Sequence, residues 1–321
     1  GAFYYKGEGV AQDFAEAVKW LRLAADQGHP EAQSNLGLCY QHGEGVAKDL
    51  AAAVTWFRKA ADQDYAPAQC NLGACYASGN GVAKDLVEAV KWYRKAAEQG
   101  IPTAQAALGF FYNQGDGVAQ DHAAAVKWCR LAAAQGDADG QSKLGAFYYK
   151  GEGVAQDYAE AVKWLRLAAE QGDPEAQNNL GICYGNGNGV AKDFAAAVKW
   201  YSLAADQGYA GAQANLGSRY FHGEGVAKDA ATAVKWYRMA AEQGHARAQA
   251  DLGGCYLMGT GVAKNQMEAY AWFHLAAKTN APAAKCRDDL EQALSSRQLA
   301  SAQKRAAELA ALINAAPQRD K

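Results

Sequence analysis

Hydrophobic residues recur along the chain with the spacing of paired helices. Within 31–42, Ala32, Leu36 and Tyr40 fall at i, i+4 and i+8, which places them on one face of a helix. The next stretch, 50–63, carries small and aromatic residues at spacings of three and four: Ala53, Trp56, Phe57, Ala60 and Ala61. The sustained alternation of apolar and polar residues that marks a strand is absent. The pattern predicts an all-α fold built from helix pairs.

Glycine and aspartate residues predict where each helix ends and the next begins. Gly43 follows the first stretch and favours the left-handed backbone conformation that ends a helix. Residues 45–48 then form a tight connection, and Asp49 is suited to accept hydrogen bonds from the first N–H groups of the second helix. The same position holds Asp13, Asp49, Asp85, Asp121, Asp157, Asp193, Asp229 and Asn265.

The helix pair repeats every 36 residues. Eight tryptophans share one register: Trp20, Trp56, Trp92, Trp128, Trp164, Trp200, Trp236 and Trp272. A fixed period of this length is typical of a solenoid, in which each unit stacks only on its neighbours. Because one helix pair cannot bury its own apolar face, we expect the tryptophans, the fixed tyrosines and the leucine of each Leu-Gly pair to lie between units. A Trp→Ala change within the array is expected to cost about 3–5 kcal/mol.

The register changes at the C-terminal end. Asp288 and Asp289 stand where a Leu-Gly pair is expected. Two further helices are predicted, at 283–294 and 297–315. The second has an apolar stripe: Leu299, Ala302, Ala306, Leu309 and Ile313. We therefore divide the chain into a repeat array, 1–282, and capping helices, 283–321, that close the last apolar face.

The first residues repeat a later part of the chain. Residues 1–28 match 145–172 except at Phe14/Tyr158 and Asp26/Glu170, so the chain is expected to begin near the end of a first helix. This pattern predicts a piece of a longer protein, built by duplication of a four-unit block.

Composition excludes several classes of protein. The chain has 321 residues, a net charge of −2 and 50% hydrophobic residues, which argues against a disordered protein. The 32 Lys and Arg against 34 Asp and Glu leave no cationic excess for phosphate, so a strongly basic nucleic-acid binder is excluded. No apolar run reaches the roughly 18 residues of a membrane span.

Candidate chemistry has simpler structural explanations. Cys39, Cys75, Cys183 and Cys255 share a position with phenylalanines in other repeats, which favours packing thiols over metal ligands. Pairings such as Cys70 with Cys75, or Cys39 with His42, lack a second matched pair. The Gly-x-Gly turns are explained by a helix connection rather than a phosphate cradle. We expect no enzyme activity, no metal and no cofactor.

The repeated residues resemble the Sel-1-like repeat family, which is related to tetratricopeptide repeats. The motif is carried by Ala176-Gln177, Leu180-Gly181, Tyr184, Gly187, Gly189-Val190, Asp193, Ala197-Val198, Trp200-Tyr201, Ala204-Ala205 and Gln207-Gly208. The resemblance covers residues 1 to about 282. It implies a right-handed α/α superhelix and a non-catalytic role as adaptor or scaffold, commonly in bacterial signalling, envelope assembly or host interaction.

Variable positions on the first helices suggest a binding surface. The bulky tryptophan on each second helix is expected to curve the array and place the first helices on its concave face. In tetratricopeptide relatives an asparagine at this place lines the concave groove and clamps a peptide backbone or a carboxylate. The candidate ladder is Asn35, Asn71, Asn179 and Asn215, with Asp251 at the same position. Neighbouring side chains that would set selectivity are Leu38, Phe110, Lys143, Ile182 and Arg219. The alternative is that these asparagines bridge adjacent repeats.

Three functions remain open from the sequence. A scaffold would bind a protein or peptide on the concave face. A ligand-processing protein would act on β-lactams or peptidoglycan, and a structural spacer would bind nothing. Unpaired cysteines favour the cytoplasm, whereas an upstream signal peptide would direct the chain to the periplasm or outside the cell.

Overall fold

The chain folds into consecutive α-helices in the part that the computed structural model describes, which is residue 4 and residues 11–315. No strand occurs among these residues. The predicted truncated first helix lies outside the described residues, except for Tyr4. The helices are α2 (Phe14–Asp26), α3 (Pro30–His42), α4 (Leu50–Ala61), α5 (Ala66–Ser78), α6 (Leu86–Glu98), α7 (Pro102–Gln114), α8 (His122–Ala134), α9 (Ala138–Lys150), α10 (Tyr158–Glu170), α11 (Pro174–Asn186), α12 (Phe194–Asp206), α13 (Ala210–His222), α14 (Ala230–Glu242), α15 (Ala246–Met258), α16 (Gln266–Ala276), α17 (Ala281–Ala293) and α18 (Ser296–Ala315).

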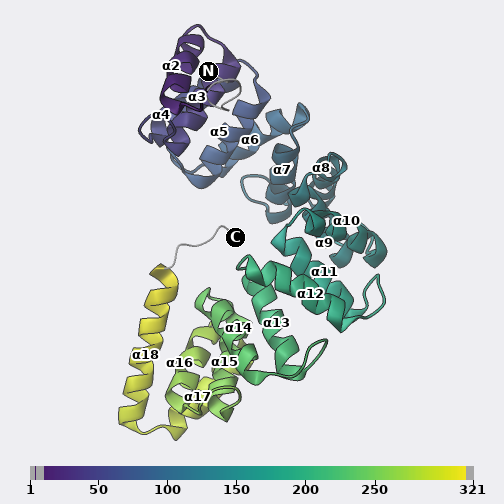
Figure 1. Ribbon diagram of the computed structural model, residues 1–321, viewed down its shortest axis with the longest axis vertical. Coiled ribbons are helices and arrows are strands. Elements are labelled where there is room, and N and C mark those ends of the chain that lie inside the picture. Colours follow the sequence, from purple (N-terminus) through teal and green to yellow (C-terminus); the bar gives the residue numbers. More distant parts are fainter. Residues whose placement is uncertain (1–3, 5–10, 316–321) are drawn as a thin grey trace. The chain divides into compact units, whose positions relative to one another are not determined.

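The helices form two compact units, Gly1–Ala168 and Ala169–Lys321, and the boundary falls within α10. In unit 1 the pairs α3–α4, α5–α6 and α7–α8 pack most closely, and each also contacts the next helix along the chain. In unit 2 the pairs α11–α12, α13–α14 and α15–α16 pack in the same way (Figure 1). This succession of helix pairs is the predicted all-α solenoid.

The predicted helix ends are confirmed. Asp49 accepts a hydrogen bond from the N–H of Ala52 at 2.9 Å, and Asn265 serves the same role for α16. Gly43 ends α3 with φ of 79°. The second helix of that repeat ends at Ala61 rather than at 63, and Asp64 adopts the left-handed φ of 63° that glycine provides in other repeats.

Close contact within each helix pair depends on the Leu-Gly sequence. The leucine is fully buried, as at Leu36, and the adjacent Gly37 leaves room for an aromatic ring of the second helix. A Cβ on Gly37 would lie 2.6 Å from Cε1 of Phe57. The side chain that follows each tryptophan, which is chemically variable, is therefore the central core residue. This set is Leu21, Phe57, Tyr93, Cys129, Leu165, Tyr201, Tyr237 and Phe273.

Most of the tryptophans are less buried than predicted, although Trp92 is 9% exposed and lies in the core. Trp56, Trp164 and Trp236 pack against the cluster formed by the preceding helices, but each remains half-buried. Trp20 is 50% exposed, whereas Trp272 is 1% exposed. Trp56, Trp164 and Trp236 therefore lie between successive helix pairs, as expected. The expected cost of about 3–5 kcal/mol stays a prediction for a fully buried ring such as Trp272, and a smaller cost is expected where the ring is half-buried.

The Gly-x-Gly turns have a second role between repeats. Gly45 has φ of 69°, and a Cβ there would collide with the carbonyl group of Phe14 at the start of the preceding second helix. Gly225 stands in the same relation to Phe194. The turn is therefore both a connection, as predicted, and a contact with the preceding repeat.

Polar side chains also link successive helices. Gln63 Nε2 donates to Gln33 Oε1 at 2.8 Å, and Gln33 donates in turn to the Ala25 carbonyl of the preceding repeat at 3.1 Å. Arg94 donates to the hydroxyl of Tyr112 at 2.8 Å. These bonds recur along the chain. The recurrence of Gln and Tyr at fixed positions of the repeat is therefore explained by contacts between repeats.

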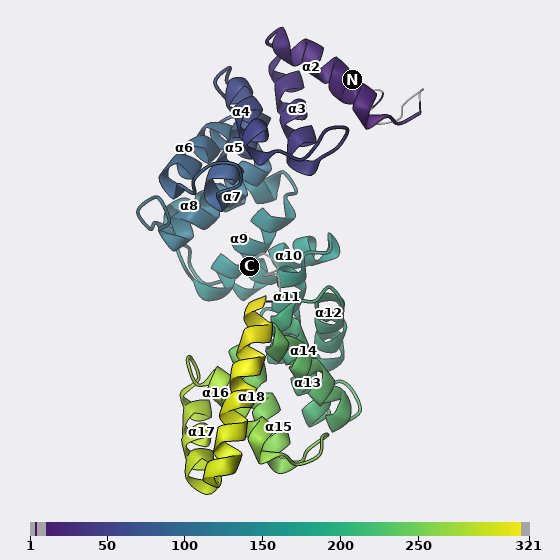
Figure 2. The ribbon, with the colours of Figure 1, turned by 90° about the vertical axis from the view of Figure 1, so that its left-hand side faces the viewer.

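Two helices follow the last helix pair. α17 and α18 both pack against α16, and α18 also reaches α14 (Figure 2). The predicted stripe of α18 contributes Ala302, Ala306 and Leu309 to the buried cluster around Trp272. Arg305 Nε bonds Glu268 Oε1 of α16 at 2.7 Å.

Candidate functional site

The four candidate asparagines lie half-buried on the first helices of their repeats. Each precedes a fully or almost fully buried leucine, for example Leu72 after Asn71 and Leu180 after Asn179. A helix turns by about 100° per residue, so this neighbouring position falls at the edge of the core. Their amides therefore lie partly within reach of solvent.

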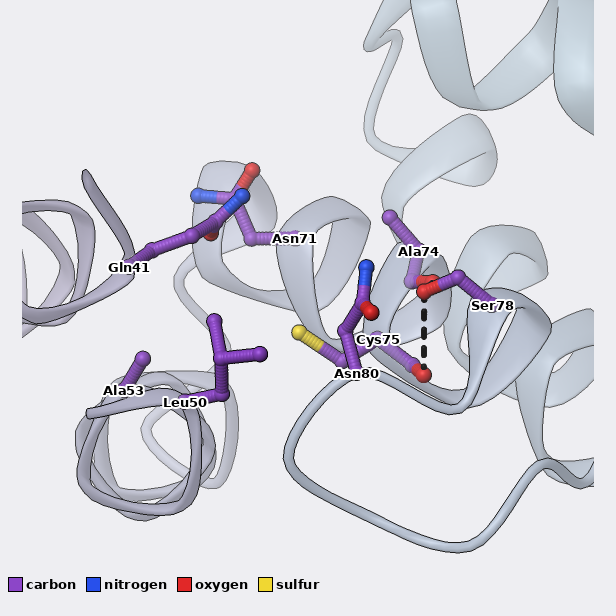
Figure 3. Close-up of a pocket in the computed structure, with 8 residues that line it drawn as sticks. All are labelled: Gln41, Leu50, Ala53, Asn71, Ala74, Cys75, Ser78 and Asn80. Atoms are coloured by element: carbon purple, nitrogen blue, oxygen red, sulfur yellow. Dashed lines mark hydrogen bonds between the residues drawn. The ribbon is translucent and has the colours of Figure 1, made fainter. Parts of the chain in front are cut away.

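Asn71 lines a small opening in unit 1. The opening lies between α3, α4 and α5, and Gln41 and Asn80 also end in it (Figure 3). Ser78 belongs to the same wall, but its hydroxyl donates to the Ala74 carbonyl at 2.8 Å. The volume is about 60 Å³, which admits water or one side chain and is far below the roughly 300 Å³ of a small-molecule site.

Amide groups of unit 2 bond to one another across repeats. Asn215 Nδ2 donates to Asn178 Oδ1 at 2.9 Å. Asn178 Nδ2 lies 3.4 Å from Asn179 Oδ1. Two of the candidate asparagines are thus joined through a residue that the sequence analysis did not select. This arrangement agrees with the bridging alternative at Asn215.

Phe110 and Lys143 are brought together in unit 1. Phe110 of α7 is 39% exposed, and the ammonium group of Lys143 lies 5.9 Å from its ring centroid. Asp139, one turn before Lys143 on α9, forms an ion pair with it. An exposed ring beside a cation and a carboxylate offers both apolar and charged contacts.

The aliphatic candidates are partly used in packing. Leu38 lies against the buried cluster that contains Phe57 and Leu72. Ile182 lies against the cluster around Tyr201 in unit 2. Each keeps part of its side chain exposed. Leu38 and Ile182 therefore lie at the edge of the core, with one part of the side chain packed and another part exposed.

Arg219 is directed toward its own loop. It occupies the position that holds the buried Cys183 and Cys255 in other repeats. Its guanidinium pairs with Glu224 and lies 5.1 Å from the ring centroid of Phe194. These contacts hold the Arg219 guanidinium next to the turn that follows α13.

Asp251 carries the one acidic group at the asparagine position. Its Oδ2 lies 3.8 Å from Nε of Arg247. Burial raises the pKa of the Asp251 carboxyl, and Arg247 and His222 partly oppose this rise. The carboxylate in turn adds to the raised pKa of Tyr237, which is caused mainly by burial.

Most of the cysteines lie in the core, whereas Cys70 and Cys286 are partly exposed. Burial raises the pKa of Cys39, Cys75, Cys183 and Cys255 to about 11, so they are protonated at neutral pH. Within the described residues, no group of three or more His, Cys, Asp or Glu side chains is placed to hold a metal ion. Nor does any helix in that part of the chain have the length and hydrophobicity needed to cross a membrane.

Two residues of the opening were missed by sequence reasoning. Gln41 and Asn80 lie at the end of α3 and in the turn after α5. The variability of the last residues of the first helices, such as Gln41-His42 and Ala77-Ser78, was the available signal. It did not show that residues from successive repeats share one opening.

Comparison with protein families matches the Sel1 repeat model eight times, at residues 1–29, 30–65, 66–101, 102–137, 138–173, 174–209, 210–245 and 246–278. A Sel1 repeat protein from Oxalobacter formigenes is 36% identical, with a TM-score of 0.65, over 86% of this chain and 80% of that one. The protective antigen c5321 of uropathogenic Escherichia coli, which displays the SLR fold, is 33% identical with a TM-score of 0.50. That similarity covers 100% of this chain and 85% of the antigen. Comparison with curated proteins finds no match.

Proposed function

The chain belongs to the Sel1 repeat family, whose members are generally protein-interaction scaffolds, and we propose that it binds an extended peptide segment of a protein partner along its first helices. The observation that carries this proposal is the shared opening of Gln41 and Asn71. Primary amides both donate and accept hydrogen bonds, which matches the N–H and C=O groups of an extended backbone. The Sel1 fold is typically non-enzymatic, in agreement with a binding role.

The exposed Phe110 with Lys143 supports the same proposal. An aromatic ring supplies a large contact area, and the adjacent ammonium and carboxylate groups select polar or charged neighbours. In this arrangement the amides of Gln41 and Asn71 bind the peptide backbone, and Phe110 and Lys143 contact one of the peptide's side chains. Leu38 is a further variable position of unit 1, and we assign it to selectivity there. In unit 2, Ile182, Arg219 and Asp251 are the positions at which repeats differ, and we assign them to selectivity within that unit.

The test begins with a peptide selected from a random display library on the full chain. Its affinity is then measured by calorimetry for Gln41→Ala with Asn71→Ala. Loss of two backbone hydrogen bonds is expected to weaken binding about tenfold or more. Lys127→Ala, on the exposed face of α8, is the matched control and should bind normally.

A melting curve separates binding from bridging. If Asn71 contacts the peptide, the double variant loses affinity and keeps its melting temperature. If it only joins repeats, the melting temperature falls and the affinity stays the same, and the proposal is rejected at this site. Asn215→Ala provides the reference for bridging, because its amide bonds Asn178.

A further inference from the structure

Exposed aliphatic residues recur at one position of the second helices. The position three residues after each tryptophan holds Leu23, Lys59, Lys95, Leu131, Leu167, Leu203, Met239 and Leu275. Leu203 and Met239 are 42% and 45% exposed. Neither belongs to a buried cluster. We call Leu203, Met239 and Leu275, which all lie in unit 2, the aliphatic row.

The fold itself does not require an aliphatic residue at this position. Lys59 and Lys95 occupy it on α4 and α6, where their ammonium groups lie 3.9 Å and 4.4 Å from the ring centroids of Trp56 and Trp92. Helices α4 and α6 nevertheless have the same caps and the same packed core as the others. The helix pair therefore folds without an aliphatic residue at this position, which leaves such a residue free for another contact.

The last member of the row shows what packs on it. Leu275 lies against the cluster that α18 covers, and it lines one space with Ala310 and Ile313 of α18. α18 is an amphipathic helix that buries Ala302, Ala306 and Leu309. It reaches the end of α14, where a Cβ on Gly244 would lie 3.6 Å from Ile313. α18 therefore reaches from α16 to α14, the helix that carries Met239. Leu203 holds the same position on α12, one repeat earlier in the chain.

We propose that Met239 and Leu203 form a docking surface for an amphipathic helix of a protein partner, which extends the interface made by α18 on Leu275. The argument rests on continuity: the same repeat position is covered by an apolar helix face on α16 and is open on α14 and α12. Such a helix presents its Leu, Ile or Ala residues at spacings of three and four. This surface is formed by second helices of unit 2, whereas the opening of Gln41 and Asn71 belongs to unit 1.

The test uses a helix-stapled peptide with the sequence of residues 296–315, because this helix already fits one member of the row. Binding of the labelled peptide to the full chain is followed by fluorescence anisotropy. Leu203→Lys with Met239→Lys should weaken binding at least tenfold, and lysine at this position is compatible with the fold in α4 and α6. Val87→Lys, an exposed apolar position outside the row, should leave binding unchanged.

Three results would overturn the proposal. In the first, the peptide does not bind the chain. In the second, the peptide binds the double variant as tightly as it binds the original chain, which would mean that it replaces α18 on α16 instead. In the third, sedimentation shows that the original chain self-associates and that the double variant is monomeric. The surface would then be occupied by a second copy of the chain. Circular dichroism of each variant confirms that the helices are retained.

Discussion

Helices α14 and α16 hold equivalent positions in neighbouring repeats of unit 2, yet their surroundings differ. Trp236 on α14 is half-buried, whereas Trp272 on α16 is 1% exposed. Met239 is 45% exposed, whereas Leu275 is half-buried beneath α18. The difference comes from α17 and α18, which pack on α16. The same repeat residue is therefore core or surface according to what its neighbour provides.

The polar links of the two helices differ in the same way. Arg238 of α14 donates to the hydroxyl of Tyr256 at 2.7 Å, which is the link found between ordinary repeats. On α16 the equivalent residue is His274, and the links run instead to the capping helices. Tyr270 donates to Glu291 Oε1 at 2.6 Å, and Glu268 accepts from Arg305.

Replacement of the two tryptophans should give the largest contrast. Trp272→Ala removes a fully buried ring and is expected to cost about 3–5 kcal/mol of the free energy of unfolding. Trp236→Ala removes a half-buried ring and should cost about 1–2 kcal/mol, since less apolar area is lost. Guanidinium unfolding followed by circular dichroism measures both. Equal losses would show that α17 and α18 contribute nothing to the burial of Trp272.

The polar links should show a smaller contrast. Arg305→Ala leaves the mostly buried Glu268 without its partner and is expected to cost about 1–3 kcal/mol. Arg238→Ala removes a bond to a neutral hydroxyl and should cost about 0.5–1.5 kcal/mol. The same unfolding measurement compares them. A larger loss for Arg238→Ala would contradict the view that α18 is held by a charge pair.

Asp251→Asn should have the smallest effect on stability, and the size of this effect depends on pH. Because burial raises the pKa of Asp251 in the folded chain, the protonated form is favoured there, and stability falls as pH rises through that raised pKa. Asparagine, which other repeats carry at this position, cannot ionise. We expect a higher melting temperature than the original chain at pH 7 and no difference well below the pKa of an ordinary aspartate. A variant that melts lower at pH 7 would show that the ion pair with Arg247 dominates.

Much of the local structure could be read from the chain itself. The capping Asp residues, the turn glycines and the helix stretches were located within about two residues, because these depend on local backbone chemistry. The candidate site was harder to predict from the sequence. Asn71 and Gln41 come from different repeats, and only the packing of α3 on α4 and α5 brings them to one opening. The sequence likewise left open that Asn215 bonds Asn178.

The sequence by itself determined the period, the helix boundaries and the identity of the repeat, because these follow from residues close together in the chain. Only the tertiary structure decided which side of each second helix is buried, with Phe57 against Gly37 and Trp56 at the edge. It also decided that α18 covers Leu275 and leaves Met239 open. The physical reason is that burial is a property of what lies across the seam, and residues with identical repeat positions face different neighbours.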